Sequence, residues 1–183
     1  GIVTSLDVAS NLDRFAGPGG WNDPDMLVVG LKNTGNIKGG GCNDIEYRSQ
    51  MSMWCMIAAP LMIGCDISRM DEMTKTILSN KDIVAIDQDP LGKQGFRVIK
   101  KDGFEAWKKP LSNNKVAIAL LNRNSTDKSV SASWKELELK PDAKYKIYDV
   151  WKHASVETVN GRISANLKPH ECEVFVFSPA DGK

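Results

Sequence analysis

The sequence predicts an α/β region followed by an all-β region, and three observations support this. The spacing of apolar residues changes once along the 183 residues, between Gly92 and Gly95. Before this point, helical spacing alternates with short apolar runs, which is typical of parallel strands joined by crossover helices. After it, short β-branched or aromatic runs are separated by turn residues about every 8 to 12 positions, which is typical of an antiparallel β-sandwich. We therefore expect two domains, over residues 1–94 and 95–183.

Helices in the first region are predicted from their capping residues. Asn43 is followed three positions later by an acidic residue and then by a long run with helical spacing, which is a capping-box pattern. Asp71 and Asn80 are the expected N-caps of two shorter helices. The run LMIGCDI at residues 61–67 is too short for a helix, so we expect a buried strand there.

The second region is expected to contain seven or eight strands. Asp102 and Gly103 interrupt two strand-like runs and predict a β-hairpin with a two-residue turn. The further predicted strands are KVAIALLN, KSVSASW, KYKIYDVW, GRISANL and ECEVFVFS.

Composition and charge exclude several classes of function. The 24 basic and 23 acidic residues give a net charge of +1, so we expect no nucleic-acid partner. The longest apolar run is far below the roughly 20 residues that span a bilayer, so we expect no membrane partner. The chain begins with Gly1 and shows no secretory leader, which would have a basic segment followed by an apolar one. We expect it to be a piece of a longer protein.

We expect neither a metal nor a cofactor. No CxxC spacing is present, and only two histidines could complete a zinc site. The four cysteines are expected to be reduced and structural. His153 and His170 have no partner at a catalytic spacing, so we assign them no chemistry. A group of five lysines is expected to form a solvated face: Lys100, Lys101, Lys108, Lys109 and Lys115.

The stretch GPGGWNDPDMLVVG, residues 17–30, places Asp23 and Asp25 two positions apart. Such a pair could be catalytic, could bind a metal or could only form a turn. No histidine or third carboxylate follows at a ligand spacing, which argues against a metal. The glycines lack the spacing of a phosphate-binding loop. On residue types alone, the turn interpretation is favoured, because turns readily recruit aspartate.

Longer motifs change this interpretation. The stretches GPGGWNDPDMLVVG, EYRSQMSMWCMIAAPLMIGCDI, SNKDIVAIDQDPLGKQG, KVAIALLNR and HECEVFVFSP, in this order, resemble the melibiase-type α-galactosidases. The resemblance runs from Asp13 to Pro179. It implies the C-terminal part of a (β/α)8 TIM barrel followed by an antiparallel β-sandwich. It also places the seventh barrel strand at residues 20–23 and the eighth at 61–67.

The resemblance implies retaining hydrolysis of terminal α-linked galactose in oligosaccharides or glycoconjugates, which requires two carboxylates. In the family these lie on the fourth strand and after the sixth strand, both earlier in the chain than residue 17. Asp7 and Asp13 lack the expected neighbours, so we expect no catalytic residue here and no activity from this chain alone. Asp25 and Met26 are expected to bind substrate. Asp23 and Trp21 are expected to support them from behind, Trp21 either as a packing residue or as a sugar platform.

Several alternatives remain open. The family resemblance is compatible with α-N-acetylgalactosaminidase or β-L-arabinopyranosidase, and the sandwich could instead be a non-catalytic sugar-binding or interaction module. The expected partners are a galactoside substrate and either the N-terminal barrel segment or another copy of the chain. The sequon at residues 124–126 slightly favours an extracellular or lysosome-like compartment. The aromatic candidates for a binding face on the sandwich are Trp107, Trp134, Tyr145, Tyr148 and Trp151.

Overall fold

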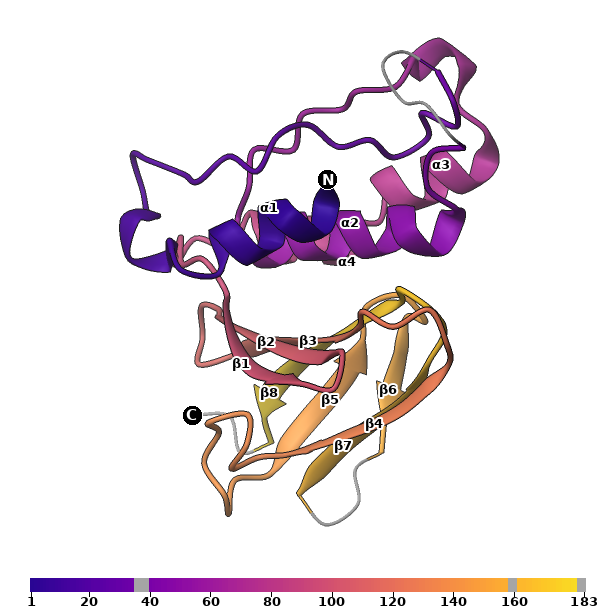
Figure 1. Cartoon of the computed structure of the whole chain (residues 1–183). Helices are drawn as coiled ribbons and strands as arrows, with labels where there is room; N and C mark the ends of the chain where they lie inside the picture. Colours follow the sequence, from indigo (N-terminus) through magenta and orange to yellow (C-terminus); the bar gives the residue numbers. More distant parts are fainter. Residues whose placement is uncertain (35–39, 158–160, 181–183) are drawn as a thin grey trace.

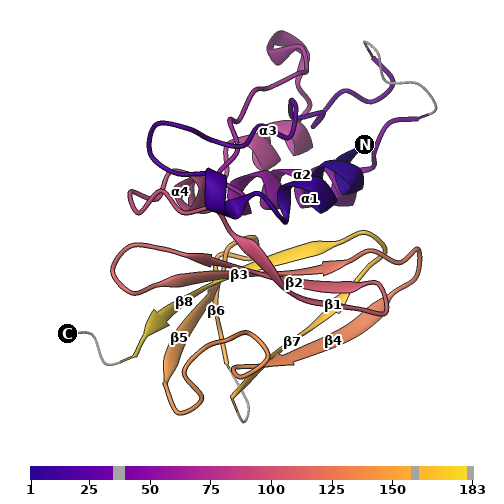
Figure 2. The same ribbon diagram turned by 60° about the vertical axis from the view of Figure 1, so that its left-hand side comes forward.

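The computed structural model describes residues 1–34, 40–157 and 161–180. Figure 1 shows the arrangement as layers, with two extended segments above a layer of helices and the β-sandwich below it. The view in Figure 2 shows the same order, with α1, α2 and α4 lying over β1, β2 and β3. The helical layer is therefore enclosed between the extended segments and the sandwich.

The helices begin at the residues that their caps predict. Asn43 accepts a hydrogen bond from the Glu46 backbone N–H at 3.0 Å, and the Glu46 carboxylate accepts one from the Asn43 N–H at 2.9 Å. This confirms the capping box. Asp71 and Asn80 also cap the helices that follow them, as predicted. The helices of the described residues are α1 (Ile2–Ala9), α2 (Asp44–Met56), α3 (Glu72–Leu78) and α4 (Lys81–Asp87).

The strands form two antiparallel sheets, as the sequence predicts. The larger sheet has the order β1-β2-β3-β8-β5-β6, and the smaller pairs β4 with β7. Asp102 and Gly103 have φ values of 51° and 73°, so both central residues of the hairpin turn are left-handed, as in a type I′ turn. The strands are β1 (Phe96–Lys101), β2 (Phe104–Pro110), β3 (Val116–Asn122), β4 (Lys128–Ser133), β5 (Tyr145–Asp149), β6 (Ala154–Val156), β7 (Arg162–Leu167) and β8 (Cys172–Pro179).

Neither expected barrel strand is a regular strand, and the prediction that residues 61–67 are buried is wrong. Residues 20–23 form no strand, and residues 61–67 contribute a single bridge, in which Ile63 pairs in parallel with Leu27. The bridge is made by the Leu27 N–H to the Met62 carbonyl at 2.8 Å and the Gly64 N–H to the Leu27 carbonyl at 3.0 Å. The pairing is short because Pro60, on one side of it, has no N–H to donate and the backbone of the other segment turns left-handed before Leu27.

Strand β3 explains how the layers are joined. Ala117, Ala119 and Leu121 belong to a core shared with the helices, whereas Ile118 and Leu120 belong to the core between the two sheets. Alternate side chains of a strand point to opposite faces, so both faces of β3 are buried. The helical layer and the sandwich therefore share one hydrophobic core along the large sheet.

One of the five lysines does not lie on a solvated face. Lys109 is buried, and its ammonium group donates a hydrogen bond to the Cys55 carbonyl at 2.8 Å. Cys55 lies in the last turn of α2, where backbone carbonyls lack helical partners and attract a cation. The expectation for Lys109 is therefore wrong, because the end of α2 supplies an acceptor inside the core.

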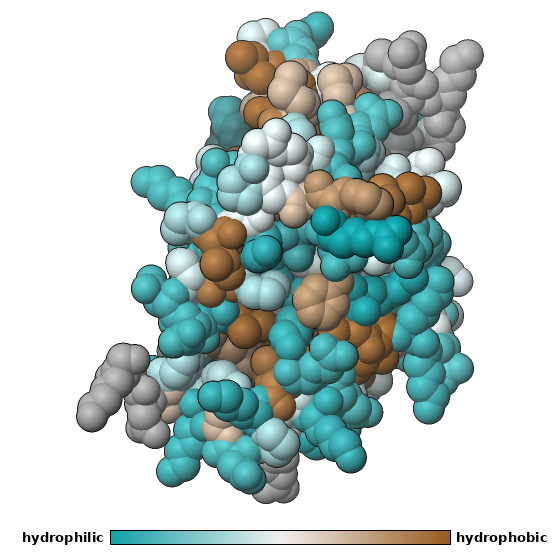
Figure 3. Space-filling view, turned by 90° about the vertical axis from the view of Figure 1, so that its left-hand side faces the viewer, coloured by the Kyte–Doolittle hydropathy of each residue, from teal (hydrophilic) through white to brown (hydrophobic). Residues whose placement is uncertain are grey.

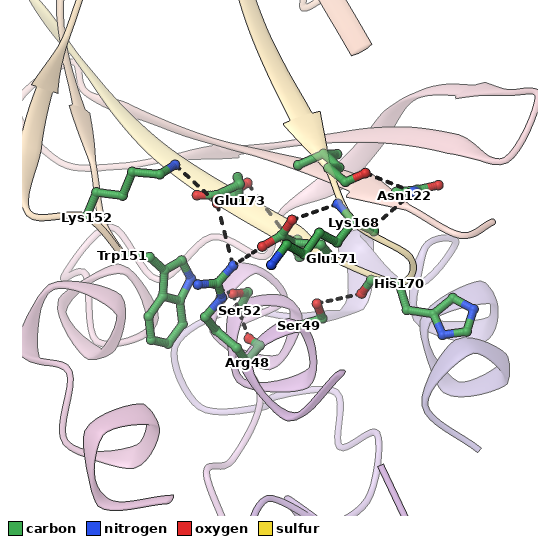
Figure 4. Close-up of polar contacts among 12 residues, drawn as sticks. Arg48, Ser49, Ser52, Asn122, Trp151, Lys152, Lys168, His170, Glu171 and Glu173 are labelled. Carbon is green, nitrogen blue, oxygen red and sulfur yellow. Dashed lines mark hydrogen bonds and ion pairs between the residues drawn. The ribbon is translucent and has the colours of Figure 1, made fainter. Parts of the chain in front are cut away.

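A network of charged side chains crosses the junction between α2 and β8 (Figure 4). Arg48 pairs with Glu171 and lies 3.5 Å from a carboxylate oxygen of Glu173. Lys152 lies 3.2 Å from the same oxygen and 2.8 Å from Asp149. Burial raises the pKa of Glu173, whose side chain is only 7% exposed. Both cations are therefore needed to compensate for carboxylates that the sheet removes from water.

We predict that Arg48→Ala lowers the free energy of unfolding by about 3 kcal/mol. The change removes a positive charge that pairs with the carboxylates of Glu171 and Glu173, which are buried away from water. Urea denaturation measures the difference. Arg162→Ala is the matched control, because Arg162 makes an exposed 3.8 Å pair with Glu136 and should cost below about 1 kcal/mol. Equal losses of unfolding free energy in Arg48→Ala and Arg162→Ala would show that the network around Arg48 does not stabilise the junction.

Candidate functional site

Asp25 and Met26 lie in the extended segment immediately before the bridged residue Leu27. Asp25 has φ 83°, a left-handed conformation that is unfavourable for most residues with a side chain. Its side chain is exposed, and Met26 is 50% exposed beside it. The structure therefore presents both predicted residues at the surface, on a backbone that is not a regular strand.

Asp23 stabilises the turn that precedes Asp25. One oxygen of its carboxylate accepts a hydrogen bond from the Asp25 N–H at 2.9 Å. This is the two-residue side-chain-to-backbone contact that aspartate makes in turns. The Asp25 carboxylate accepts a hydrogen bond from the Met26 N–H at 2.7 Å. The turn interpretation of this stretch is therefore correct for Asp23, and it does not exclude a binding role for Asp25.

A cavity of about 420 Å³ lies between α1 and residues 22–25. Both carboxylates line it, and Thr4 and Ser5 line it from the side of the helix. Its lining thus combines two acids with two hydroxyl groups, which suits a ligand that is rich in hydrogen-bond donors and acceptors.

Two buried residues of α2 contact the backbone of this segment from behind. The Trp54 indole N–H donates to the Asp25 carbonyl at 2.7 Å. The Gln50 amide donates to the Met26 carbonyl at 3.2 Å and accepts from the Val28 N–H at 2.9 Å. The sequence predicts the helix but assigns no binding role to Trp54 or Gln50. The available signal was a glutamine close to apolar residues on that helix.

A second pair of amides fixes the start of the segment. Asn22 donates to the Leu12 carbonyl at 2.7 Å and to the Gln94 side-chain oxygen at 2.8 Å. Gln94 is buried and donates to the Ala9 carbonyl at 2.8 Å, so this contact ties the end of α1 to the residues before β1. Sequence reasoning missed both residues.

Trp21 is 44% exposed. Its ring lies against Gly92, where an added Cβ would come within 3.1 Å of the indole. One part of the ring is thus used for packing, while the rest remains open to solvent.

Asp7, which was considered as a catalytic candidate, lies in an ion network instead. Its carboxylate is 2.9 Å from Arg123 and 2.9 Å from Arg97, and Lys100 lies 3.6 Å away. Hydrogen bonds from Arg123 and then Arg97 hold the pKa of Asp7 well below its usual range. A carboxylate held between arginines is a poor nucleophile and a poor acid, so Asp7 serves to anchor α1 to β1 and β3.

Asp87, the last residue of α4, is an acid of the helical layer whose pKa is raised. One of its oxygens is buried without a hydrogen-bond partner among the described residues. Burial raises its pKa from 3.8 to about 6, against the opposing effects of Gln88 and Lys109. Asp87 is remote in sequence from the Asp25 segment, and its environment explains the shift without a catalytic role.

Large exposed apolar side chains gather in one part of the chain. Figure 3 shows one face of the molecule, where apolar patches are interspersed with polar side chains. Among the described residues, all ten large exposed hydrophobic side chains belong to positions below 95. They are Val3, Val8, Phe15, Trp21, Met26, Met62, Ile63, Ile67, Met73 and Leu91. The surface of the sandwich shows no comparable set over the residues that the structure describes.

The aromatic candidates of the sandwich pack inward. Trp107 and Trp134 are buried, and the ring of Trp134 meets Tyr145 and Phe177 edge-on at 5.9 and 5.3 Å between centroids. Tyr148 donates to the Asp82 carboxylate at 2.8 Å. These contacts leave no row of exposed aromatic rings within the described strands, which disfavours a sugar-binding face on the sandwich.

Within residues 1–34, 40–157 and 161–180, no three His, Cys, Asp or Glu side chains are grouped so that they could hold a metal ion. Over the same ranges, no helix has both the length and the apolar character needed to cross a membrane. All four cysteines are free.

Comparison with known proteins assigns the family. Residues 4–89 match the family described as alpha galactosidase A, and residues 101–177 match the alpha galactosidase C-terminal beta sandwich domain. An α-galactosidase of Oryza sativa is 44% identical over 180 residues, which are 98% of this chain and 41% of that protein. Human α-galactosidase A is 44% identical over 126 residues, which are 67% of this chain and 28% of that protein.

Solved structures give the same result. A putative α-galactosidase/melibiase from Bacteroides fragilis has a TM-score of 0.91 at 40% identity, over 97% of this chain and 38% of that one. The fold and these matches define a region of a longer protein, namely the end of a barrel and the sandwich that follows. The chain belongs to the melibiase-type α-galactosidase family. It spans about two fifths of the length of the rice relative.

We predict that Asp87→Asn gains thermal stability relative to the wild type as the pH rises. A carboxyl group whose folded pKa is raised stabilises the fold fully below its ordinary pKa, and loses that contribution as the pH passes about 6. The difference in melting temperature between variant and wild type should therefore move in favour of the variant between about pH 4 and about pH 7.5. The exposed Asp142→Asn should show no such trend. A difference independent of pH would contradict the raised pKa.

Proposed function

We propose that the whole protein is an α-galactosidase that hydrolyses terminal α-linked galactose in oligosaccharides or glycoconjugates with retention of configuration. This chain contributes one wall of the sugar pocket, formed by Asp25 and Met26. The observation that supports this most directly is the exposed, left-handed Asp25 beside the parallel bridge, within the segment that matches the family. Strained residues of this kind concentrate at functional sites.

The two residues suit the two sides of a pyranose. An ionised carboxylate accepts hydrogen bonds from sugar hydroxyl groups, and such charge-assisted bonds are stronger than neutral ones. The Met26 thioether is flexible and polarisable, so it can pack against the apolar C–H face of the ring. Asp23 supports Asp25 through its backbone contact, and Trp21 closes the segment behind it.

Asp23 and Asp25 do not act as the two catalytic carboxylates in this proposal. A retaining glycosidase needs one carboxylate free to attack the anomeric carbon and a second free to exchange a proton. One oxygen of each carboxylate accepts a backbone N–H, from Asp25 and Met26 respectively, and the family resemblance implies that the catalytic pair lies earlier in the chain. The nucleophile and the acid/base therefore come from the N-terminal barrel segment, as the family resemblance implies.

That segment is also the partner we propose for the exposed apolar side chains of residues 1–94. Met62 and Ile63 are 59% and 45% exposed, although the bridge with Leu27 is the kind of pairing found inside a barrel. Closed barrels leave no such edge, because each strand has two neighbours. The length of the rice relative, of which this chain covers 41%, favours the remaining barrel over a second copy as the occupant.

For the sugar specificity, we propose galactose over the sister substrates. The relatives named α-galactosidase reach 44% identity. Structures described as a β-L-arabinopyranosidase of Geobacillus stearothermophilus and a putative α-N-acetylgalactosaminidase of Bacillus halodurans are 24% and 21% identical and share the fold.

For the compartment, we propose an extracellular or lysosome-like location. The sequon at residues 124–126 lies in the loop between β3 and β4, and its Ser125 and Thr126 are exposed. The side-chain amide nitrogen of Asn124 donates to the Asp102 carbonyl at 3.2 Å, and a glycan would replace the second hydrogen of the same nitrogen.

We predict that the 183-residue chain alone does not hydrolyse p-nitrophenyl α-galactoside, because both catalytic carboxylates lie outside it in this proposal. Joining the chain to the N-terminal barrel of the rice relative should produce turnover, measured by release of nitrophenolate. Turnover by the chain alone that disappears when an aspartate within residues 1–30 is replaced would overturn this assignment.

We predict that Asp25→Asn in the same fusion lowers kcat/KM at least about tenfold, because a hydrogen bond to a charged group contributes about 1.5–3 kcal/mol. Asparagine tolerates the left-handed backbone, so the melting temperature should change little. Asp127→Asn removes one negative charge at an exposed position of the sandwich, and it controls for the change in net charge. Normal kinetics together with a collapse in stability would show that Asp25 is only a turn residue.

A further inference from the structure

We propose that Trp54 and Gln50 are positioning residues, which hold the backbone of residues 25–28 so that the Asp25 carboxylate is presented to the sugar. Neither side chain reaches the surface, since each is 1% exposed. Both act through the backbone of the binding segment. The inference rests on the proposed function, because it supposes that Asp25 binds substrate.

Trp54 fixes Asp25 itself. Its indole N–H donates to the Asp25 carbonyl at 2.7 Å, and the Asp25 N–H donates to the Asp23 carboxylate at 2.9 Å. Both backbone polar groups of Asp25 are therefore bonded while its φ is 83°. The left-handed conformation costs less for aspartate than for most residues, and these two bonds hold Asp25 in it.

Gln50 bonds to the edge of residues 26–28 that lies opposite the bridge. It donates to the Met26 carbonyl and accepts from the Val28 N–H, which are the groups that alternate with those of Leu27 along an extended chain. The Leu27 groups bond to residues 62 and 64 on the opposite edge. Both edges of residues 26–28 are thus satisfied, one by backbone and the other by a single side chain.

The helix that carries both residues is held rigidly. Trp54 belongs to the core shared with the large sheet, and α2 is fixed at its start by the capping box and at its end by Lys109. The sandwich therefore holds α2 in place. Two side chains of α2, Trp54 and Gln50, in turn hold the backbone that positions the Asp25 carboxylate. A residue that acts in this way should change substrate binding more than it changes chemistry.

The test compares Trp54→Phe with Trp107→Phe in the chain fused to the N-terminal barrel of the rice relative. Both variants remove one buried indole N–H from the core shared by the helices and the large sheet, since Trp107 on β2 donates to the Glu105 carboxylate at 2.9 Å. We expect comparable losses in melting temperature. Only Trp54→Phe should lower kcat/KM, by about five- to tenfold and mainly through KM.

Gln50→Glu provides a second variant of nearly the same shape. It keeps an acceptor for Val28 but loses the donor for the Met26 carbonyl, so it should raise KM as well. Unchanged KM in both Trp54→Phe and Gln50→Glu, with Asp25→Asn impaired, would overturn the positioning role and leave the proposed function intact. Unchanged kinetics in Asp25→Asn would instead remove the proposed function on which the inference rests.

Discussion

The burial of helix α2 on all sides is the constraint on which the rest of the structure depends. Nine of its thirteen residues are buried, and they include serine and glutamine as well as apolar residues. A helix enclosed in this way must satisfy its polar side chains through neighbouring layers. Ser52 accepts from the Trp151 indole at 2.9 Å, and Ser49 donates to the His170 carbonyl at 2.7 Å, both toward the sandwich. Gln50 and Trp54 bond to the binding segment on the other side.

This enclosure makes the sandwich part of the site's framework. The face of β3 that carries Ala117, Ala119 and Leu121 packs under the helices, so the sheet cannot shift without disturbing α2. Protein interiors are packed densely and transmit such displacements. The network of charged side chains around Arg48 also holds α2 against the large sheet. Buried ion pairs fix one arrangement of the two layers even where they add little stability. The sandwich thus supports the candidate site, and its described strands show no row of exposed aromatic rings.

Local chemistry was enough to predict the parts of the fold that depend on neighbours in sequence. Asn43, Asp71 and Asn80 cap their helices because their side chains reach backbone N–H groups only two or three residues away. The Asp102-Gly103 turn follows from residue types in the same way. Strand β6 was missed because three residues are too few to show a period. Lys109 was misplaced because its acceptor, the Cys55 carbonyl, lies 54 positions away.

The site shows the same division between local and distant causes. The residue pattern around Asp23 predicts a turn, and the structure contains one; family resemblance was needed to suggest that Asp25 also binds. The turn interpretation and the binding interpretation are compatible, because the turn directs the Asp23 carboxylate to the backbone and the Asp25 carboxylate to solvent. Asp23 bonds to backbone within the turn, and this bond helps to keep Asp25 left-handed with its carboxylate outward. The remaining support comes from α2, more than twenty residues along the chain, through contacts that no local pattern encodes. A distant buried helix can therefore hold the backbone of a turn so that one of its carboxylates stays exposed, as a binding residue requires.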